Sequence, residues 1–364
     1  MNAKKSEILL NLWIVVISLL AALVIAEVFI RVKWTNYWKN YNRSIILREL
    51  VPNDKRVYSR KNLFAQGGYV TVRTDEDGFM LPDFIDKGTS KVMTIAFLGA
   101  STTECFWVDE ALRFPYLTSK EVADTYNIST RVLNSGGSSN TSHHSLNVLL
   151  NKVINYNPDI VLMLHAVNDA TLLMGTGNYK PAMIEEKDMS LFDWASRKSS
   201  LIGFLRHIRA QYLINKGHRK IARGLMEKKD ARSYQTEDTA SLEKALAQFA
   251  VRLKIFVDVT RDMGAVPVLV TQPYYQKIQY QLTEEGRKTS LAGINYMDKF
   301  NEQIRETAKL KECALIDLAG ELDQDAKYFY DHLHYSEEGS RKVAGLIFKH
   351  LQEIVPSILR EGNK

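Results

Sequence analysis

Four short segments of this chain carry the side chains that acyl transfer needs. Ser101 follows an apolar run, and Asp331 and His334 supply an acid and a base three residues apart. Asn168 and the small-residue loop at 134–142 (NSGGSSNTS) offer amide groups that could hold a developing oxyanion. A serine, a histidine with an orienting aspartate and a set of amide donors are the parts of a covalent serine hydrolase.

Each segment also has a purely structural explanation. Loops favour Gly, Ser, Asn and Asp whatever their function. Ser101 followed by Glu104 has the form of a capping box, which places the serine at or beside the start of a helix. The chemical interpretation therefore requires that the fold bring all four segments to one place.

The pattern of apolar runs predicts such a fold. Five strand-like runs, most of them apolar without alternation, are separated by helical patterns, which indicates a parallel sheet with helices on both faces. The runs are 92–98, 131–134, 159–164, 266–271 and 313–318. Ser101, the 134–142 loop and Asn168 follow the first three runs, and Asp331 with His334 follows the fifth. We expect all four segments at the carboxyl edge of the sheet, where open α/β sheets bind ligands.

In this order, the four segments resemble the sequence blocks of the SGNH hydrolases, also called GDSL-type esterases and lipases. Phe97–Glu104 (FLGASTTE) resembles the first block and Asn134–Ser142 the second. Ala166–Asp169 (AVND) resembles the third and Asp331–His334 (DHLH) the last. The resemblance spans about 92 to 356. It implies a flavodoxin-like three-layer α/β/α fold with a five-stranded parallel sheet.

The resemblance also implies roles for individual residues. Ser101 is the expected nucleophile, His334 its general base and Asp331 the residue that orients the imidazole. The amides of Ser101 and Ser139 and the side chain of Asn168 are expected to form the oxyanion hole. No cofactor is expected. No metal is expected either, because the histidines near the site lack the spacing of a metal motif; they are His143, His144, His165 and His332.

Three positions depart from the pattern of this family. Ser139 stands where a glycine usually supplies an oxyanion amide, so the loop must adopt the required φ and ψ without the freedom of glycine. Alternatively, Gly136 or Gly137 supplies that amide. Ala166 replaces a commoner glycine, and Ala100 replaces the usual aspartate before the serine.

The N-terminus contains a run long enough to cross a membrane. Residues 8–26 include no charge, and at about 1.5 Å per residue they nearly span a hydrocarbon core of roughly 30 Å. A retained transmembrane anchor is the favoured interpretation, and a cleaved signal peptide ending at Ala26 is the alternative. Lysine and arginine follow the run more often than they precede it, which would leave the large domain in the cytoplasm. Long domains translocate largely regardless of such charges, so we expect a single-pass membrane protein with a periplasmic or extracellular catalytic domain.

The remaining sequence suggests the domain plan. We expect an anchor at 1–34, a stalk and β-rich preface at 35–91 and a hydrolase domain at 92–356. A helical insertion at 182–239 interrupts that domain. The formal net charge is +6, and between Arg197 and Lys229 there are ten Lys or Arg and one acid. The insertion could be a solvated charged helix, a lid, or a surface facing anionic lipid or glycan. Nucleic acid is not expected, because the basic cluster lacks interleaved stacking aromatics.

The substrate stays open at this stage. We expect removal of O-acyl groups, acetyl above all, from a cell-envelope carbohydrate. A lipid esterase, lysophospholipase or thioesterase is the alternative enzyme. An O-acetyltransferase or a non-catalytic glycan-binding assembly protein on the same fold is the alternative of another class.

Overall fold

The computed structural model describes residues 2–33, 49–60, 68–179, 239–275 and 294–361, with short pieces at 195, 198–205 and 208–209. The chain divides into two compact units. One contains Met1–Ile46 and Lys180–Ile221, and the other contains Leu47–Tyr179 and Ala222–Lys364. Most of the insertion predicted at 182–239 lies outside the described residues.

The larger unit is built on a sheet whose strand order is β3-β5-β4-β6-β7-β8. Five of these strands are mutually parallel, as the apolar runs predict. They are β4 (Val92–Gly99), β5 (Ser129–Gly136), β6 (Ile160–Leu164), β7 (Val266–Val270) and β8 (Ala314–Ile316). The sixth, β3 (Phe84–Ile85), is antiparallel to β5 at the edge and makes the sheet mixed. The sequence did not predict it, because two residues are too few to show a period.

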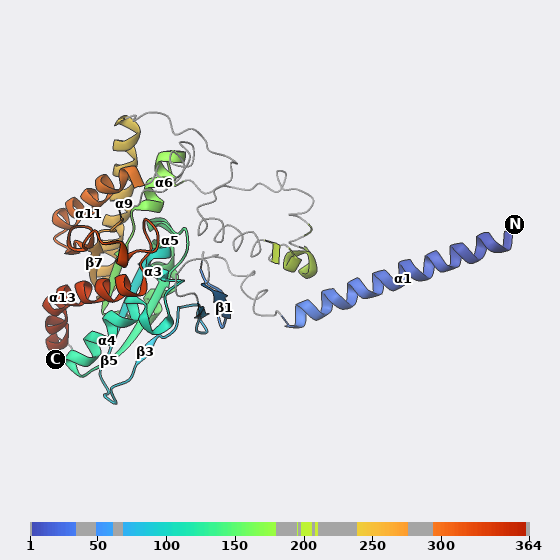
Figure 1. Ribbon diagram of the computed structural model, residues 1–364, viewed down its shortest axis with the longest axis horizontal. Coiled ribbons are helices and arrows are strands. Elements are labelled where there is room, and N and C mark those ends of the chain that lie inside the picture. Colours follow the sequence, from blue (N-terminus) through green and yellow to red (C-terminus); the bar gives the residue numbers. More distant parts are fainter. Residues whose placement is uncertain are drawn as a thin grey trace. The chain divides into compact units, whose positions relative to one another are not determined.

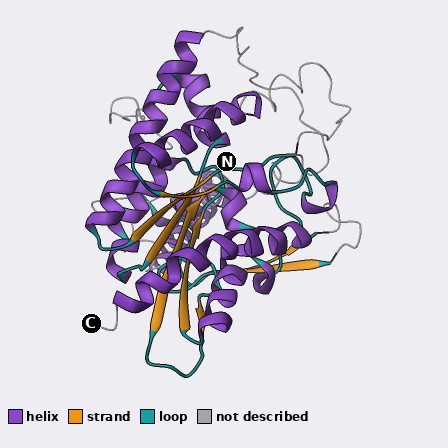
Figure 2. Cartoon of the chain, turned by 90° about the vertical axis from the view of Figure 1, so that its left-hand side faces the viewer, coloured by secondary structure: helices purple, strands orange, loops and turns teal. Residues whose placement is uncertain are grey.

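Helices cover both faces of the sheet, so the unit has three layers (Figures 1 and 2). One face packs against α5 (Ser142–Asn151), α6 (Val167–Thr176), α9 (Thr239–Asp262) and α11 (Met297–Leu310). The other face packs against α4 (Phe114–Tyr126) and α13 (Glu337–Glu361).

Strand β4 shows why the apolar runs do not alternate with polar residues. Ile95 and Phe97 belong to the core on the α4 and α13 side, whereas Ala96 and Leu98 belong to the core on the α9 side. All four side chains are buried. A strand with helices on both faces is apolar on both, and β4 follows this pattern at every position but Thr94.

The short elements complete the unit. Strands β1 (Lys55–Ser59) and β2 (Tyr69–Arg73) form an antiparallel pair within the segment that the sequence analysis expects to be β-rich. The buried Arg113 donates from Nη1 to the carbonyl oxygen of Leu81 at 2.8 Å and from Nη2 to that of Thr71 at 3.2 Å, and so ties this preface to the start of α4. Six single-turn helices remain among those that the structure describes. They are α3 (Ser101–Glu104), α12 (Leu318–Glu321), η1 (Glu110–Leu112), η2 (Val153–Tyr156), η4 (Ile294–Tyr296) and η5 (Ala326–Tyr328).

The smaller unit contains the long helix α1 (Asn2–Lys33). Its segment Leu10–Lys33 has a mean hydropathy of 2.7 in its most apolar window, and only 6% of that window is buried. Among the described residues, it is the one helix long and apolar enough to cross a membrane. An N-terminal signal sequence can meet the same criterion of length and composition.

Candidate active site

Three neighbouring strands end at the same level of the sheet and place three of the predicted segments side by side. In the register, Gly99 of β4 pairs with Gly136 of β5 and with Leu164 of β6. Ser101 begins α3 directly after β4, and Asn168 lies in the first turn of α6 after β6. The sheet therefore brings Ser101, the loop after β5 and Asn168 to one edge, as predicted.

Two glycines allow α3 to lie against this edge. A Cβ added to Gly99 would lie 2.0 Å from Thr103 Oγ1, and one added to Gly136 would lie 2.1 Å from the backbone nitrogen of Glu104. Real Cβ atoms do not approach so closely. Glycine is needed at both positions because the turn carrying Ser101 packs directly on the strand ends.

Ser101, His334 and Asp331 form a continuous hydrogen-bonded chain. The Ser101 Oγ lies 2.8 Å from His334 Nε2, and His334 Nδ1 lies 2.7 Å from Asp331 Oδ2. The other carboxylate oxygen, Asp331 Oδ1, accepts from the backbone N–H groups of Leu333 and His334 at 2.8 Å each. The ring of Tyr330 stacks on the imidazole, with centroids 5.4 Å apart. The imidazole is thus hydrogen-bonded at both ring nitrogens, to Asp331 through Nδ1 and to Ser101 through Nε2.

Asp331 and His334 each stabilise the charged form of the other. Burial acts to raise the pKa of Asp331, but the positive charge of His334 and the hydrogen bonds to the carboxylate outweigh it and lower that pKa. Burial likewise acts against the imidazolium, yet the Asp331 carboxylate outweighs it and raises the pKa of His334. Since an ionised carboxylate can only accept, Nδ1 carries the imidazole proton and Nε2 is free to accept from the serine hydroxyl.

The loop after β5 presents Ser139 in an unusual backbone conformation. Its φ is 63°, in the left-handed region that favours glycine. The amide of Gly136 donates to Asn134 Oδ1 at 3.0 Å, and the amide of Gly137 donates to the carbonyl of Gly99 at 3.3 Å. Both alternative oxyanion amides are thus already engaged within the fold, which leaves Ser139 as the better candidate.

Asn168 is tied to the same loop. Its Nδ2 donates to the carbonyl oxygen of Asn140 at 2.8 Å. This bond uses one of the two hydrogens of the amide and leaves the second as a possible donor. The side chain is therefore oriented by the residue next to Ser139.

Glu104 belongs to the site, although the sequence suggested a different role for it. The predicted capping box is wrong: Ala100 is the N-cap of α3, no side chain caps it, and Ser101 is the first helical residue. The Glu104 carboxyl instead accepts from Ser138 Oγ and is 2% exposed. Burial raises its pKa to about 7, against the opposing effects of Ser138, Arg113 and His334. A long-range partner thus outcompetes the local capping pattern.

A second buried carboxyl supports the far end of the loop. Asp169, fully buried, accepts from the backbone N–H of Ser142 at 3.0 Å and from the hydroxyls of Ser142 and Tyr179. Burial raises the pKa of Asp169 to about 6. The neighbouring His165 has its pKa lowered to about 3 by burial, so it is neutral there.

The capping box that does occur is at the start of α5, between Thr141 and His144.

Gln272 is a further residue that the sequence analysis missed. It follows β7 and is buried. Its Oε1 accepts from the backbone N–H of Val167 at 3.0 Å, and its Nε2 donates to Thr102 Oγ1 at 3.4 Å. It thus connects the turn of Ser101 to the turn of Asn168. Gln272 directly follows the predicted strand 266–271. It therefore carried the same signal that identified the other segments, a polar residue just after a strand.

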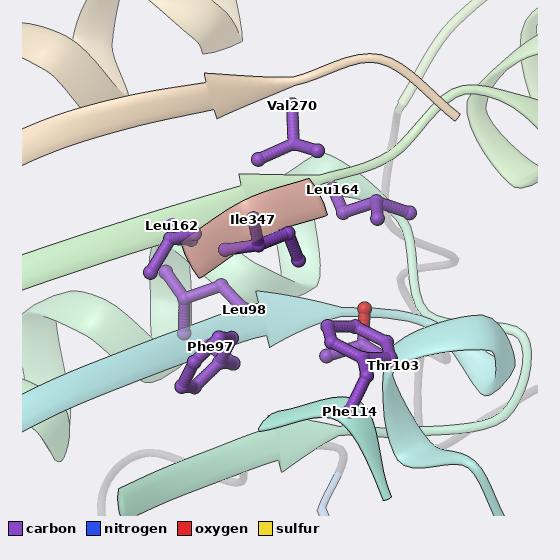
Figure 3. Close-up of a pocket in the computed structure, with 8 residues that line it drawn as sticks. All are labelled: Phe97, Leu98, Thr103, Phe114, Leu162, Leu164, Val270 and Ile347. Atoms are coloured by element: carbon purple, nitrogen blue, oxygen red, sulfur yellow. The ribbon is translucent and has the colours of Figure 1, made fainter. Parts of the chain in front are cut away.

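A small void lies behind the site, in the core beneath α3 (Figure 3). Its volume is about 10 Å³, room for roughly one water molecule. Seven apolar side chains and Thr103 line it: Phe97, Leu98, Phe114, Leu162, Leu164, Val270 and Ile347. It is a packing gap of the core and cannot hold a substrate.

Three other histidines of the described part of the chain make structural contacts. His144 closes the capping box of α5, His165 Nε2 lies 2.7 Å from Ser145 Oγ, and His332 Nδ1 lies 3.3 Å from the carbonyl oxygen of Tyr275. Within the part of the chain that the structure describes, no three His, Cys, Asp or Glu side chains gather so that they could hold a metal ion.

Comparison with known proteins gives a likeness of fold. No family model and no curated protein matches the sequence. Among solved structures, the chain is similar to a lipase/acylhydrolase from Enterococcus faecalis, with 17% identity, a TM-score of 0.43 and coverage of 72% of this chain and 96% of the other. It is similar to an acetylxylan esterase from Geobacillus stearothermophilus, with 14% identity, a TM-score of 0.43 and coverage of 73% and 96%. It is also similar to an alpha/beta hydrolase enzyme from the metagenome of Lake Arreo, Spain, with 13% identity, a TM-score of 0.43 and coverage of 71% and 94%.

Proposed function

We propose that this protein is a serine ester hydrolase of the SGNH type, with Ser101 as nucleophile, His334 as general base and Asp331 as the orienting acid. The observation that carries the proposal is the unbroken chain of hydrogen bonds from Ser101 Oγ through His334 to Asp331. Three residues separated by up to 233 positions meet in this order at the carboxyl edge of a parallel sheet. A serine that served only as a helix cap would have no need of such partners.

The reaction begins with proton transfer from Ser101 to His334. As Oγ attacks the ester carbonyl carbon, Nε2 takes the hydroxyl proton, and the Asp331 carboxylate stabilises the imidazolium that forms. The raised pKa of His334 favours this transfer because the base binds the proton more strongly. His334 then gives the proton to the leaving alkoxide, and the acyl group stays on Ser101.

The oxyanion of the tetrahedral intermediate is held by three donors in this proposal. They are the backbone amides of Ser101 and Ser139 and the Nδ2 of Asn168. As the first residue of α3, Ser101 has an N–H without an acceptor inside its own helix. Each donor of this kind contributes about 100- to 1,000-fold to turnover where one has been removed.

Water completes the cycle. His334 Nε2 removes a proton from water, which attacks the acyl-serine carbonyl, and Ser101 Oγ leaves with the proton returned by the imidazolium. The carboxylic acid product is released, and the free serine is restored. Transfer of the acyl group to a sugar hydroxyl in place of water would make the same site an acetyltransferase.

Ser101→Ala tests the assignment. The variant should lose hydrolysis of 4-nitrophenyl acetate and labelling by a fluorophosphonate probe, while Ser357→Ala, at an exposed position of α13, should keep both. Unchanged hydrolysis in Ser101→Ala would exclude the mechanism. Wild-type protein that neither reacts with the probe nor cleaves esters would favour a non-catalytic glycan-binding role.

For the substrate, we propose short O-acyl groups, acetyl above all, on a cell-envelope carbohydrate. The N-terminal helix, which is long and apolar enough to cross a membrane, favours a substrate of the envelope. Initial rates on acetylated xylo-oligosaccharide should exceed those on long-chain lipid esters, lysophospholipid and acyl thioesters. The reverse order would support the lipid esterase or thioesterase alternative. Acetylated acceptor sugar formed from an acetyl donor would identify a transferase.

We also propose that the chain is organised as an anchor at 1–34, a preface at 35–91 and a catalytic domain at 92–356 with an insertion, and that this domain is exported. A large domain behind a lone N-terminal helix can translocate despite the basic residues that follow the helix. Phosphatase fused after the last residue should be active in the periplasm. Activity confined to a cytoplasmic reporter would place the domain inside.

A further inference from the structure

Glu27 is the one acidic residue of the apolar segment Leu10–Lys33 of α1, and the smaller unit shows what it binds. Its Oε1 accepts from the backbone N–H of Ser200 at 2.7 Å. Its Oε2 accepts from the backbone N–H of Leu201 and from the hydroxyl of Ser199, each at 2.8 Å. The carboxylate therefore caps the start of the helical residues 200–205 and joins the insertion to α1.

The position of Glu27 along α1 locates this junction relative to a bilayer. At a rise of about 1.5 Å per residue, Leu10–Lys33 is about 36 Å long, slightly more than a hydrocarbon core of roughly 30 Å. Glu27 lies about 9 Å before Lys33 by the same arithmetic. With Arg31 and Lys33 among the headgroups, Glu27 lies at the boundary between headgroups and acyl chains. A carboxylate at that depth needs partners. Arg31 pairs with it at 3.0 Å, and Ser199, Ser200 and Leu201 supply the others.

The segment that begins at this junction has the chemistry of a membrane surface. Leu205 is 53% exposed and Ile208 is 48% exposed. Lys198 and Arg209, near the two ends of the same segment, are exposed as well. Exposed apolar side chains flanked by Lys and Arg are typical of helices that lie in the interface of an anionic bilayer. The charge of the region agrees, with ten basic residues and one acid between Arg197 and Lys229.

We propose that the described residues between 198 and 209 form a membrane-interface segment whose partner is an anionic lipid bilayer. Glu27 fixes the start of the segment at the headgroup boundary. Leu205 and Ile208 enter the outer acyl region, and Lys198 and Arg209 contact anionic headgroups. The inference concerns the smaller unit and does not depend on the esterase assignment.

Depth-resolved fluorescence quenching of the full-length protein tests the proposal. An environment-sensitive dye is attached to Leu205→Cys, or to Ile17→Cys in the middle of α1, with Cys105 and Cys313 replaced by serine. The protein is reconstituted in vesicles of phosphatidylglycerol and phosphatidylethanolamine carrying doxyl quenchers at a shallow or a deep acyl position. A dye at 205 should be quenched at least about twofold more by the shallow than by the deep quencher, and a dye at 17 should show the reverse.

Two variants test the parts of the proposal separately. Glu27→Ala should lower shallow quenching at 205 by about half or more, whereas Glu27→Gln, which keeps an acceptor oxygen, should fall between it and the wild type. Lys198→Gln with Arg209→Gln should lower quenching in anionic vesicles and leave it unchanged in phosphatidylcholine. A dye at 205 that neither quencher reaches overturns the proposal, whether aqueous iodide quenches it or protein shields it. Equal quenching in Glu27→Ala and wild type overturns the role of the carboxylate.

Discussion

Replacing Ser139 by glycine should stabilise the protein without slowing ester hydrolysis. With φ at 63°, the Cβ of Ser139 crowds the backbone, which costs about 1–2 kcal/mol for a residue other than glycine. Glycine relieves that strain but loses about 0.5–1 kcal/mol more conformational entropy on folding. The difference predicts a gain of about 0.5–1 kcal/mol in the free energy of unfolding.

Thermal unfolding of the purified protein measures this gain. For a unit of this size, about 1 kcal/mol corresponds to a shift of about 2–4 °C in Tm, so the variant should melt about 1–4 °C higher. Its kcat for 4-nitrophenyl acetate should stay within about threefold of wild type, because the backbone amide that would hold the oxyanion is retained.

Glu312→Gly is the matched control for Ser139→Gly. Glu312 has φ of 47° at the end of α11, so it should gain similar stability and leave kcat unchanged. A lower Tm for Ser139→Gly, beside a higher one for the control, would refute the estimate of strain in the loop. A loss of kcat beyond about tenfold in a folded variant would show that the side chain of Ser139, and not only its amide, serves the site.

Three further predictions concern groups around Ser101. Asp331→Asn should lower kcat by about 10³–10⁴-fold with little change in Tm, because an amide no longer holds the imidazole in the required tautomer; a loss below tenfold would remove Asp331 from the triad. Glu104→Gln should move the acid limb of the pH profile of kcat/KM to lower pH, because the Glu104 charge helps to raise the pKa of His334. Asp124→Asn, at an exposed acid, should leave the limb in place. Activity needs the neutral imidazole, whereas the protonated imidazole stabilises the fold. The raised pKa of His334 therefore adds stability below the ordinary histidine value of about 6.5, and this contribution is lost as the pH rises through the raised value. Gly136→Ala should cost about 1–3 kcal/mol or more and most of the activity, because the new Cβ would lie 2.1 Å from the nitrogen of Glu104. Gly345→Ala in α13, where nothing lies within 4 Å, should instead raise Tm. Similar Tm values for the two glycine variants would contradict the close approach of α3.

The sequence was sufficient to predict the elements whose burial pattern is regular. Strands β6 and β7 are apolar at every position, and β4 is apolar at every position but Thr94, because helices cover both faces of the sheet. Such runs stand out from the rest of the chain. The order of these strands places their ends at one edge, so the meeting of Ser101, His334 and Asp331 could be expected before any distance was known. The resemblance to a family supplied the order of the blocks.

The features that could not be predicted depend on contacts between distant segments. Ser101 and Glu104 match a local capping pattern, but each side chain has a partner elsewhere: Ser101 pairs with His334, and Glu104 with Ser138. Spacing within four residues gives no information about those partners. The strand β3 is held by its pairing with β5 and shows no pattern of its own.

Three polar side chains around the site share one function in the structure. Glu104 binds Ser138, Asn168 binds the carbonyl of Asn140, and Asp169 binds Ser142, so the loop containing Ser139 is held at three successive points. Gln272 in turn joins the turn of Ser101 to that of Asn168.

Donors that are fixed before the substrate arrives need no reorganisation when the oxyanion forms, which is the main source of their effect on rate. These hydrogen bonds form when the protein folds. The turn of Ser101, the loop of Ser139 and the turn of Asn168 are therefore ordered before each turnover begins. Removing any one connection should therefore leave substrate binding largely intact and lower kcat, since the loosened donor meets its acceptor only in the transition state.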